Sequence, residues 1–270
     1  MSIIVLGGVT GYVGSAIFTA MQKRGIAGIA VSRKQVDYTK REELVTLLEA
    51  AKPSFVINAA AWIPQPSVDL CKNDRAKCLR ANVILPDMIS TECNKRGIAI
   101  GHISTGCLYG DDREYTETDE PTRRVTDYAG TYVWLKYTSE MIVRELCPRS
   151  FVWRIRIPFD NQDSPRNYLT KLRQYPQIWN HTNSLTHRGD FADSALLMIE
   201  KGAPWGVYNM TNRGSIATVT IVNSAGWTGK TYVDGPVTGS RLSTAKLEAT
   251  GCGMRDVWDA VEESLRTWVA

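Results

Sequence analysis

The sequence predicts an α/β protein, a Rossmann-type doubly wound parallel sheet with a smaller C-terminal region attached to it. Apolar segments of strand length alternate with segments of helical periodicity through the first part of the chain. This alternation is typical of right-handed β–α–β crossovers in a mostly parallel sheet. The chain also opens with a short apolar strand, a glycine-rich turn and a helix, an order typical of dinucleotide-binding sheets.

The opening turn predicts a binding site for a dinucleotide pyrophosphate. Residues 3–6 are apolar and β-branched, as in a strand buried on both faces, and apolar residues at helical spacing follow until Gly25. Glycines let a pyrophosphate approach the backbone, and a helix N-terminus offers N–H groups and a positive dipole end. An ordinary tight turn is the alternative. The expected cofactor contacts are Gly8, Gly11, Tyr12, Val13 and Gly14.

The other elements follow from apolar runs, periodicity and helix-ending glycines. Strands are expected over 29–32, 55–61, 98–104 and 151–157, and helices over 41–51, 74–96 and 132–147. A polar excursion or lid is expected over 111–125. Beyond residue 157 the alternation becomes irregular, with helices expected over 167–175, 191–201 and 255–269 and a strand over 207–211. We therefore expect a dinucleotide-binding domain at 1–157 and a mainly substrate-binding region, interleaved with the core, at 158–270.

Composition excludes several classes of protein. The 270 residues are 43% hydrophobic and 22% charged, which is usual for a globular protein, and the net charge of +4 gives no reason to expect a nucleic-acid or membrane partner. No apolar run approaches ~20 residues. Six scattered cysteines without a C-x-x-C pair and three distant histidines predict neither a metal site nor a disulfide framework. A start directly in a strand favours the cytoplasm.

The end of the second strand favours NADP(H) over NAD(H). NAD-specific sheets usually carry an acidic residue there, on the ribose hydroxyls, whereas this chain has Ser32, Arg33 and Lys34. A hydroxyl and two cations suit a 2′-phosphate. The alternative is that the two cations are ordinary surface charges. Asp37 is expected near the adenine or its loop.

A phenol and an ammonium group form the predicted catalytic pair. Tyr132 and Lys136 stand four residues apart, on one face of a helix. A nearby cation and an oxidised nicotinamide both favour the phenolate of a tyrosine whose ordinary pKa is ~10, so the tyrosine becomes a workable acid/base. The hydroxyl of Thr105, at a strand end, is expected to bond the same carbonyl oxygen. Tyr132 and Lys136 are also expected to contact the cofactor, with Lys136 holding the nicotinamide ribose. Further cofactor or site contacts are expected from Ala59, Ala60, Ala61 and Asn82.

These motifs together resemble the extended short-chain dehydrogenase/reductases that act on nucleotide sugars. Residues 240–247, SRLSTAKL, are similar to a segment of dTDP-4-dehydrorhamnose reductases. Residues 66–71, 154–158 and 165–171 are closer to the plant bifunctional nucleotide-rhamnose synthases, which are 3,5-epimerase/4-reductases. The loop after Gly110 is shorter than in the plant enzymes. The resemblance implies NADP(H), a 4-keto-6-deoxy sugar nucleotide and the roles already given to Thr105, Tyr132 and Lys136.

Cys107 distinguishes the two subfamilies. In the bifunctional enzymes a cysteine at this place is the epimerising acid/base, paired across the sugar with a lysine or a histidine. The plant enzymes have that lysine in a segment that matches residues 167–171, so the resemblance implies the pair Cys107 and Lys171. The ring protons at carbons 3 and 5 are both α to the ketone, and a thiol with an ordinary pKa of ~8.5 is a fair base for them. A buried structural cysteine and a surface lysine are the alternative.

The sequence thus predicts an NADPH-dependent nucleotide-sugar epimerase/reductase that forms dTDP- or UDP-L-rhamnose. Two other functions stay open: a monofunctional 4-reductase, and a non-catalytic NADP-binding regulatory subunit. A homodimer also stays open. The expected substrate contacts, besides Thr105, are Gly106, Arg166, Asn167 and Arg241.

Overall fold

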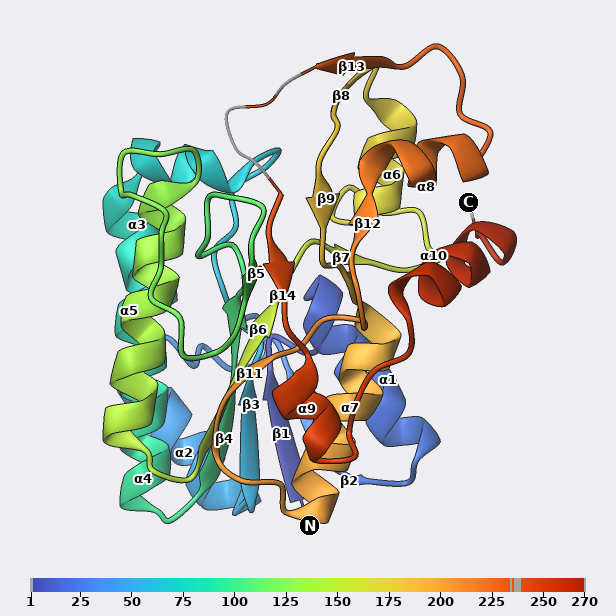
Figure 1. Cartoon of the computed structure of the whole chain (residues 1–270). Helices are drawn as coiled ribbons and strands as arrows, with labels where there is room; N and C mark the ends of the chain where they lie inside the picture. Colours follow the sequence, from blue (N-terminus) through green and yellow to red (C-terminus); the bar gives the residue numbers. More distant parts are fainter. Residues whose placement is uncertain (1, 234, 236–238, 270) are drawn as a thin grey trace. The chain divides into compact units, whose positions relative to one another are not determined.

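The computed structural model, which describes residues 2–233, 235 and 239–269, contains a six-stranded parallel sheet (Figure 1). Met1 and Ala270, the ends of the two predicted regions, lie outside the described residues. The strand order is β11-β6-β4-β3-β1-β2. Its members are β1 (Ser2–Leu6), β2 (Ala27–Val31), β3 (Phe55–Asn58), β4 (Ala99–Thr105), β6 (Ser150–Ile155) and β11 (Gly206–Asn209). The predicted fold class is confirmed.

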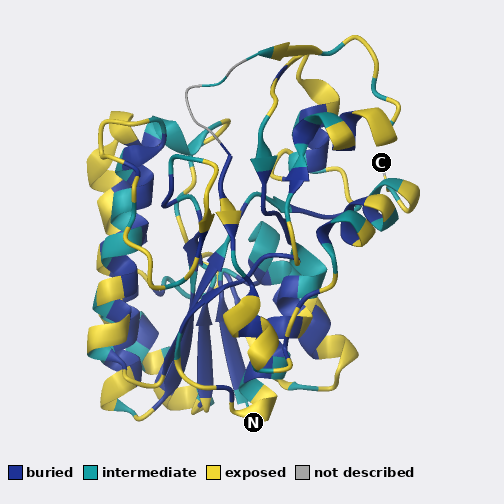
Figure 2. Ribbon diagram, viewed as in Figure 1, coloured by how far each residue is buried: buried dark blue, intermediate teal, exposed yellow. Residues whose placement is uncertain are grey.

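The inner strands are buried along nearly their whole length (Figure 2), as expected of a parallel sheet covered by helices. Helix α1 (Tyr12–Lys23) packs on β1 and β2, while α4 (Leu85–Lys95) and α5 (Gly130–Leu146) pack on β4. Helix α2 (Arg41–Ala51) matches the predicted range, and the 3-10 turn η1 (Val68–Asn73) precedes α3 (Arg75–Leu79). No helix among the described residues has both the length and the apolarity needed to cross a membrane.

The helix predicted over 74–96 changes its winding in the middle. Between α3 and α4, residues Arg80–Ile84 (η2) form a π-helical turn. Pro86 explains the change, because it has no N–H to donate to the carbonyl of Asn82, four residues earlier, and its ring would clash with that carbonyl in an α-helix. The widened turn holds Asn82, which is fully buried.

The rest of the chain contains short strands that periodicity did not predict, whereas the helices expected over 167–175, 191–201 and 255–269 are present with slightly different bounds. Strands of two or three residues form four pairs, β14 with β5, β10 with β7, β13 with β8 and β12 with β9. Their bounds are β5 (Glu114–Tyr115), β7 (Pro158–Phe159), β8 (Gln177–Trp179), β9 (Thr182–Asn183), β10 (Thr186–His187), β12 (Ile216–Ala217), β13 (Thr231–Val233) and β14 (Arg241–Leu242). The helices are α6 (Tyr168–Gln174), α7 (Arg188–Lys201), α8 (Thr218–Ser224), α9 (Ala245–Ala249) and α10 (Val257–Arg266).

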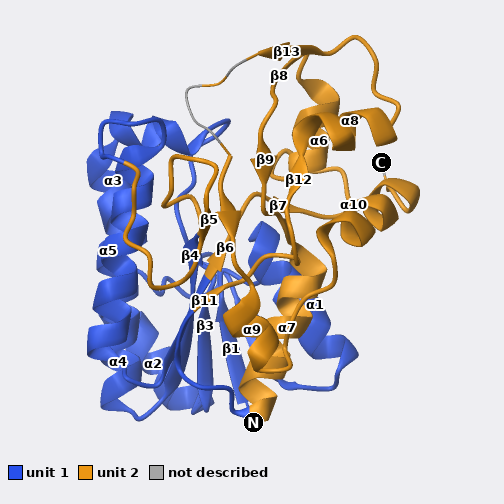
Figure 3. Cartoon of the chain, viewed as in Figure 1, with its two compact units in different colours: residues 1–105, 124–153, 202–207 blue, residues 106–123, 154–201, 208–270 orange. Residues whose placement is uncertain are grey.

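The chain forms two compact units, each discontinuous in sequence (Figure 3). The first contains residues 1–105, 124–153 and 202–207, and the second contains 106–123, 154–201 and 208–270. Each unit has an apolar core of its own: one includes Leu6, Val56 and Ile100, the other Phe159, Leu169 and Val261. The assignment of cofactor and substrate roles to 1–157 and 158–270 remains a proposal.

The segment 66–71 holds the start of α5, the helix that carries Tyr132 and Lys136. Asp69 Oδ1 accepts a hydrogen bond from the backbone N–H of Ala129 at 3.0 Å, and Ser67 Oγ lies 2.6 Å from the hydroxyl of Tyr128. Ala129 has a left-handed φ of 62°, a conformation that costs free energy unless its surroundings hold it. A hydrogen bond from Lys72, then the Ala129 N–H, lowers the pKa of Asp69 against an opposing effect of burial.

We predict that Asp69→Ala lowers the free energy of unfolding by about 1–2 kcal/mol at neutral pH, because the Ala129 N–H loses its acceptor. Asp69→Asn costs less, since an amide oxygen still accepts that bond. The folded pKa of Asp69 lies below its unfolded value, so its contribution is present above the unfolded pKa and is lost as the pH falls through the folded pKa. Denaturant unfolding at pH 7 and pH 3 measures both effects.

The control is Asp112→Ala, because this exposed carboxylate forms no hydrogen bond or ion pair with the described residues. Its stability should match wild type. An Asp69→Ala difference that persists unchanged at pH 3 would show that the carboxylate charge contributes nothing.

Candidate nucleotide-binding and catalytic site

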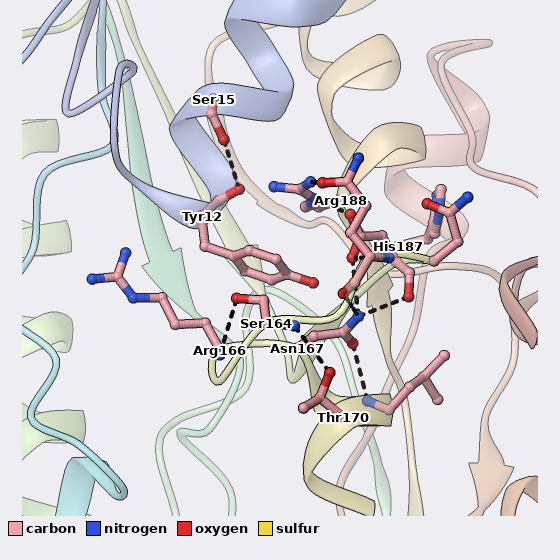
Figure 4. A network of polar contacts seen from close by, with 12 residues as sticks. Tyr12, Ser15, Ser164, Arg166, Asn167, Thr170, His187 and Arg188 are labelled. Carbon is pink, nitrogen blue, oxygen red and sulfur yellow. Dashed lines mark hydrogen bonds and ion pairs between the residues drawn. The ribbon is translucent and has the colours of Figure 1, made fainter. Parts of the chain in front are cut away.

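The glycine turn joins β1 to α1 through a close backbone approach. The N–H of Gly11 donates to the carbonyl of Gly7 at 3.1 Å. A Cβ atom on Gly11 would lie 2.3 Å from that oxygen, and one on Gly14 would lie 2.6 Å from it, so neither position accepts a side chain without rearrangement. Helix α1 begins at Tyr12, and the Ser15 hydroxyl donates to the Tyr12 carbonyl at 3.3 Å (Figure 4). The first N–H groups of a helix have no intrahelical acceptor, and this polarity at the start of α1 suits a phosphate.

Two cations follow the end of β2. Ser32 is buried and donates through its hydroxyl to Gln35 Oε1 at 2.8 Å. Arg33 and Lys34 are exposed, and neither side chain forms a hydrogen bond or an ion pair with the described residues. Asp37 accepts a 2.6 Å hydrogen bond from the Thr39 hydroxyl, which is the main cause of its lowered pKa. The two cations are therefore available to an anion.

The loop after β3 is held by a backbone hydrogen bond and by the buried side-chain amides of Asn58 and Asn82. The Ala59 N–H donates to the Leu6 carbonyl at 3.0 Å, and the Ala60 N–H donates to Asn58 Oδ1 at 3.1 Å, while Ala61 is exposed. Asn82 Nδ2 donates to the Trp62 carbonyl at 3.1 Å and to Cys78 Sγ at 3.3 Å. Asn82 thus ties the π-turn to the loop that follows β3.

Tyr132 and Lys136 lie one turn apart on α5, and both are buried. Lys136 Nζ donates to the carbonyl of Ile103 at 2.7 Å and lies 3.2 Å from His102 Nε2. Burial lowers the pKa of Lys136 to about 8, although Glu140 and Cys78 act in the opposite direction. Thr105 is the last residue of β4, the strand against which α5 packs. One strand and one helix therefore carry all three predicted reductase residues.

Sequence reasoning missed the polar groups that surround Lys136. The sequence pattern assigns His102 no role, yet its ring lies between Asn58 Nδ2, at 3.2 Å, and Ser139 Oγ, at 3.0 Å. The Ser104 hydroxyl donates to the buried carboxylate of Glu140 at 2.5 Å. The available signal was spacing, since Ser139 and Glu140 follow Lys136 by three and four residues on one helix.

Cys107 and Lys171 both belong to the second unit. Cys107 is partly exposed, and its carbonyl accepts a 2.9 Å hydrogen bond from Nε of the buried Arg123, a residue that sequence reasoning missed. Lys171 on α6 is partly buried, which lowers its pKa, and its ammonium group forms no hydrogen bond or ion pair with the described residues. Gly106 is packed so closely that an added Cβ would lie 2.4 Å from Leu242 Cδ1.

The predicted substrate-contact residues differ in how many of their side-chain hydrogen-bond donors remain available to a substrate. Asn167 is fully buried and caps α6 by accepting from the Leu169 N–H at 3.0 Å. Its Nδ2 donates to Asp160 Oδ1 at 3.0 Å and to two backbone carbonyls (Figure 4). Arg166 and Arg241 are exposed, and Arg241 Nε donates to the Asp112 carbonyl at 2.7 Å. Asn167 is thus used within the second unit, whereas the two arginines retain free donors.

Comparisons with known proteins agree with this fold. A bifunctional dTDP-4-dehydrorhamnose 3,5-epimerase/dTDP-4-dehydrorhamnose reductase from Arabidopsis thaliana is 26% identical over 219 residues, covering 78% of this chain and 70% of the relative. A UDP-rhamnose synthase from Acanthamoeba polyphaga mimivirus matches in structure with a TM-score of 0.85 at 18% identity, over 99% of both chains. A dTDP-4-dehydrorhamnose reductase from Bacillus anthracis, solved in complex with NADP, matches with a TM-score of 0.81 at 19% identity, over 98% of this chain and 97% of that one.

The family model of the RmlD substrate binding domain matches residues 1–225. This match agrees with the resemblance carried by the glycine turn, the strand-end threonine and the Tyr132/Lys136 pair. The chain belongs to the RmlD substrate binding domain family.

Proposed function

We propose that the protein is an NADPH-dependent oxidoreductase that epimerises a dTDP- or UDP-4-keto-6-deoxy-glucose at carbons 3 and 5 and reduces carbon 4, giving the L-rhamnose nucleotide. The observation that carries the proposal is the buried Lys136, one helical turn from Tyr132 and packed on the strand that ends at Thr105. The family match and the reductase and epimerase relatives support the same assignment.

The residues of the first unit fit a phosphorylated dinucleotide. Gly11 and Gly14 let the start of α1 pack closely against the Gly7 carbonyl. A pyrophosphate would bind the N–H groups of the first turn of that helix. Arg33 and Lys34 would bind the 2′-phosphate that distinguishes NADPH from NADH. When bound, the cofactor supplies the hydride.

In the proposed reduction Tyr132 is the acid. Its hydroxyl gives a proton to the oxygen of carbon 4 as hydride reaches that carbon, and the Thr105 hydroxyl bonds the same oxygen. The ammonium group of Lys136 favours the phenolate left on Tyr132, because an opposite charge stabilises the ionised form. Positions four residues apart on a helix are neighbours, which suits this effect.

In the proposed epimerisation Cys107 and Lys171 exchange the ring protons. Both protons are α to the ketone, so their removal places charge on the oxygen that Tyr132 and Thr105 bond, and one polarised carbonyl serves both reactions. The partial exposure of Cys107 suits a base that meets substrate. The lowered pKa of Lys171 increases the fraction of neutral amine, which makes proton exchange easier.

We predict that Tyr132→Phe lowers kcat for the 4-keto sugar by about 10²–10⁴-fold, because the proton donor is lost. Binding of NADPH, followed by its fluorescence, should persist. Tyr137→Phe on the same helix is the matched control and should retain turnover. Equal loss in the two variants would show that damage to α5, rather than loss of the acid, explains the result.

We predict that wild-type protein incorporates deuterium from D₂O at carbons 3 and 5 of the keto sugar without NADPH, as mass spectrometry would detect. Cys107→Ala should abolish the exchange and Lys171→Met should reduce it at one carbon, while NADPH binding persists. A wild type that reduces the sugar without exchange is a monofunctional 4-reductase. A wild type that binds NADPH and turns over no keto sugar fits the regulatory-subunit alternative.

We predict that the double variant Arg33→Ala/Lys34→Ala weakens NADPH binding by about tenfold or more and leaves NADH binding nearly unchanged, because only NADPH carries the 2′-phosphate. Titration calorimetry with both nucleotides measures the difference. Lys23→Ala, at the far end of α1, removes a similar surface charge and serves as the control. A parallel loss for both nucleotides would contradict the assigned role.

A further inference from the structure

His102 is a fully buried histidine in the middle of the sheet whose role the proposed chemistry leaves open. It lies on β4 directly across from Asn58 on β3, and three polar side chains contact its two ring nitrogens. Nδ1 is 3.2 Å from Asn58 Nδ2, and Nε2 is 3.0 Å from Ser139 Oγ and 3.2 Å from Lys136 Nζ. Burial and the Lys136 cation both hold the pKa of His102 well below its usual range, so the ring is neutral.

The hydrogen bonds determine which nitrogen carries the proton. The Ala60 N–H donates to Asn58 Oδ1, so the NH₂ group of Asn58 faces the ring and Nδ1 must accept. A neutral imidazole has one proton, which therefore lies on Nε2. The Ser139 hydroxyl donates to the carbonyl of Lys136 at 2.7 Å, which leaves its lone pairs free to accept from Nε2–H.

The Nε2–H group has a second neighbour whose hydrogen-bonding role depends on its charge. An ammonium group at Lys136 only donates, and the Ile103 carbonyl accepts from it. A neutral amine at Lys136 has a lone pair that accepts from Nε2–H, 3.2 Å away. The proton on His102 therefore favours the neutral amine over the ammonium ion.

Charged and titratable groups from the neighbouring elements also act on the Lys136 amine. Glu140 on α5 and Cys78 on α3 favour its charged form. Cys78 is in turn hydrogen-bonded to Cys71 on η1 and accepts from Asn82 on η2. Burial opposes the two acids, and the His102 Nε2–H group, 3.2 Å from the amine, acts in the same direction as burial.

We propose that His102 is a positioning residue which, as the Nε2–H tautomer locked by Asn58, donates to the neutral amine of Lys136 and lets that amine gain and lose a proton beside Tyr132. The proposal rests on the proposed function. After Tyr132 has given its proton to the substrate oxygen, the phenolate takes a proton from the Lys136 ammonium group. The resulting amine accepts from His102 until solvent returns the proton.

The test is a titration of Lys136 by NMR in full-length protein labelled with ¹⁵N-lysine, with the signal assigned by its loss in Lys136→Met. Wild-type Lys136 should titrate near pH 8. His102→Leu should move the midpoint up by about one pH unit, because the amine loses its donor. His102→Gln, which keeps an N–H at the Nε2 position, should restore it. Ser139→Ala should move the midpoint down, because Nε2–H then has only the amine as acceptor.

The titration midpoint of Lys136 is expected to rise in His102→Leu and to fall in Ser139→Ala. A general loss of packing would shift the midpoint in the same direction in both variants. Shifts of one sign, or no shift in His102→Leu, would overturn the proposal. If His102→Leu does not fold, a downward shift in Ser139→Ala with an unshifted midpoint in His102→Gln still supports the proposal, and an upward or absent shift in Ser139→Ala overturns it. The titration needs no substrate, so its failure is distinct from a failure of the proposed function, which the absence of keto-sugar reduction would reveal. The alkaline limb of the kcat profile should move with the NMR midpoint.

Discussion

A lysine amine buried between α5 and β4 is the feature on which the arrangement of the first unit depends. Burying an ammonium group costs free energy unless it is hydrogen-bonded, and Lys136 meets this requirement through the Ile103 carbonyl and nearby acids. The strand must therefore stay in register with the helix for the charge to be tolerated. That register places Tyr132 and Thr105 on the two elements that the lysine joins.

Near this lysine, two further side chains accept hydrogen bonds from backbone N–H groups at the end of a helix or strand. Asp69 holds the first backbone N–H before α5, and Asn58 holds the loop after β3 through the Ala60 N–H. Both use a side chain to satisfy a backbone donor where regular structure stops. The positions of the helix that bears Tyr132 and of the loop expected to meet the cofactor are thus determined by side chains outside both elements.

The sequence predicted a mostly parallel sheet and the helices of the first half, because long apolar runs and helical periodicity report burial directly. It extended the third strand to residue 61, whereas β3 ends at Asn58, since three alanines are apolar enough to continue either element. The short strands after residue 157 escaped prediction because two or three residues carry no period.

The candidate site combines local sequence patterns with contacts between distant parts of the chain. The glycine turn and the four-residue Tyr132/Lys136 spacing are local patterns. In the structure the turn leads directly into α1, and Tyr132 and Lys136 both lie on α5. The hydrogen-bonded chain from Asn58 through His102 to Ser139 joins residues of β3, β4 and α5, so no single window of the sequence contains it. The catalytic and binding roles themselves remain predictions.

The edge strand of the sheet beside β6 comes from a late part of the sequence, and this affects the chain while it is being synthesised. Strand β11, which lies outside β6, is contributed by residues more than fifty positions later. Until it arrives, the nascent first half exposes the backbone donors and acceptors of β6 beside the apolar run Phe151–Trp153. An open apolar edge of this kind pairs readily with other chains. The late strand therefore acts as the chain's protection against aggregation, and fragments cut near residue 157 lack it.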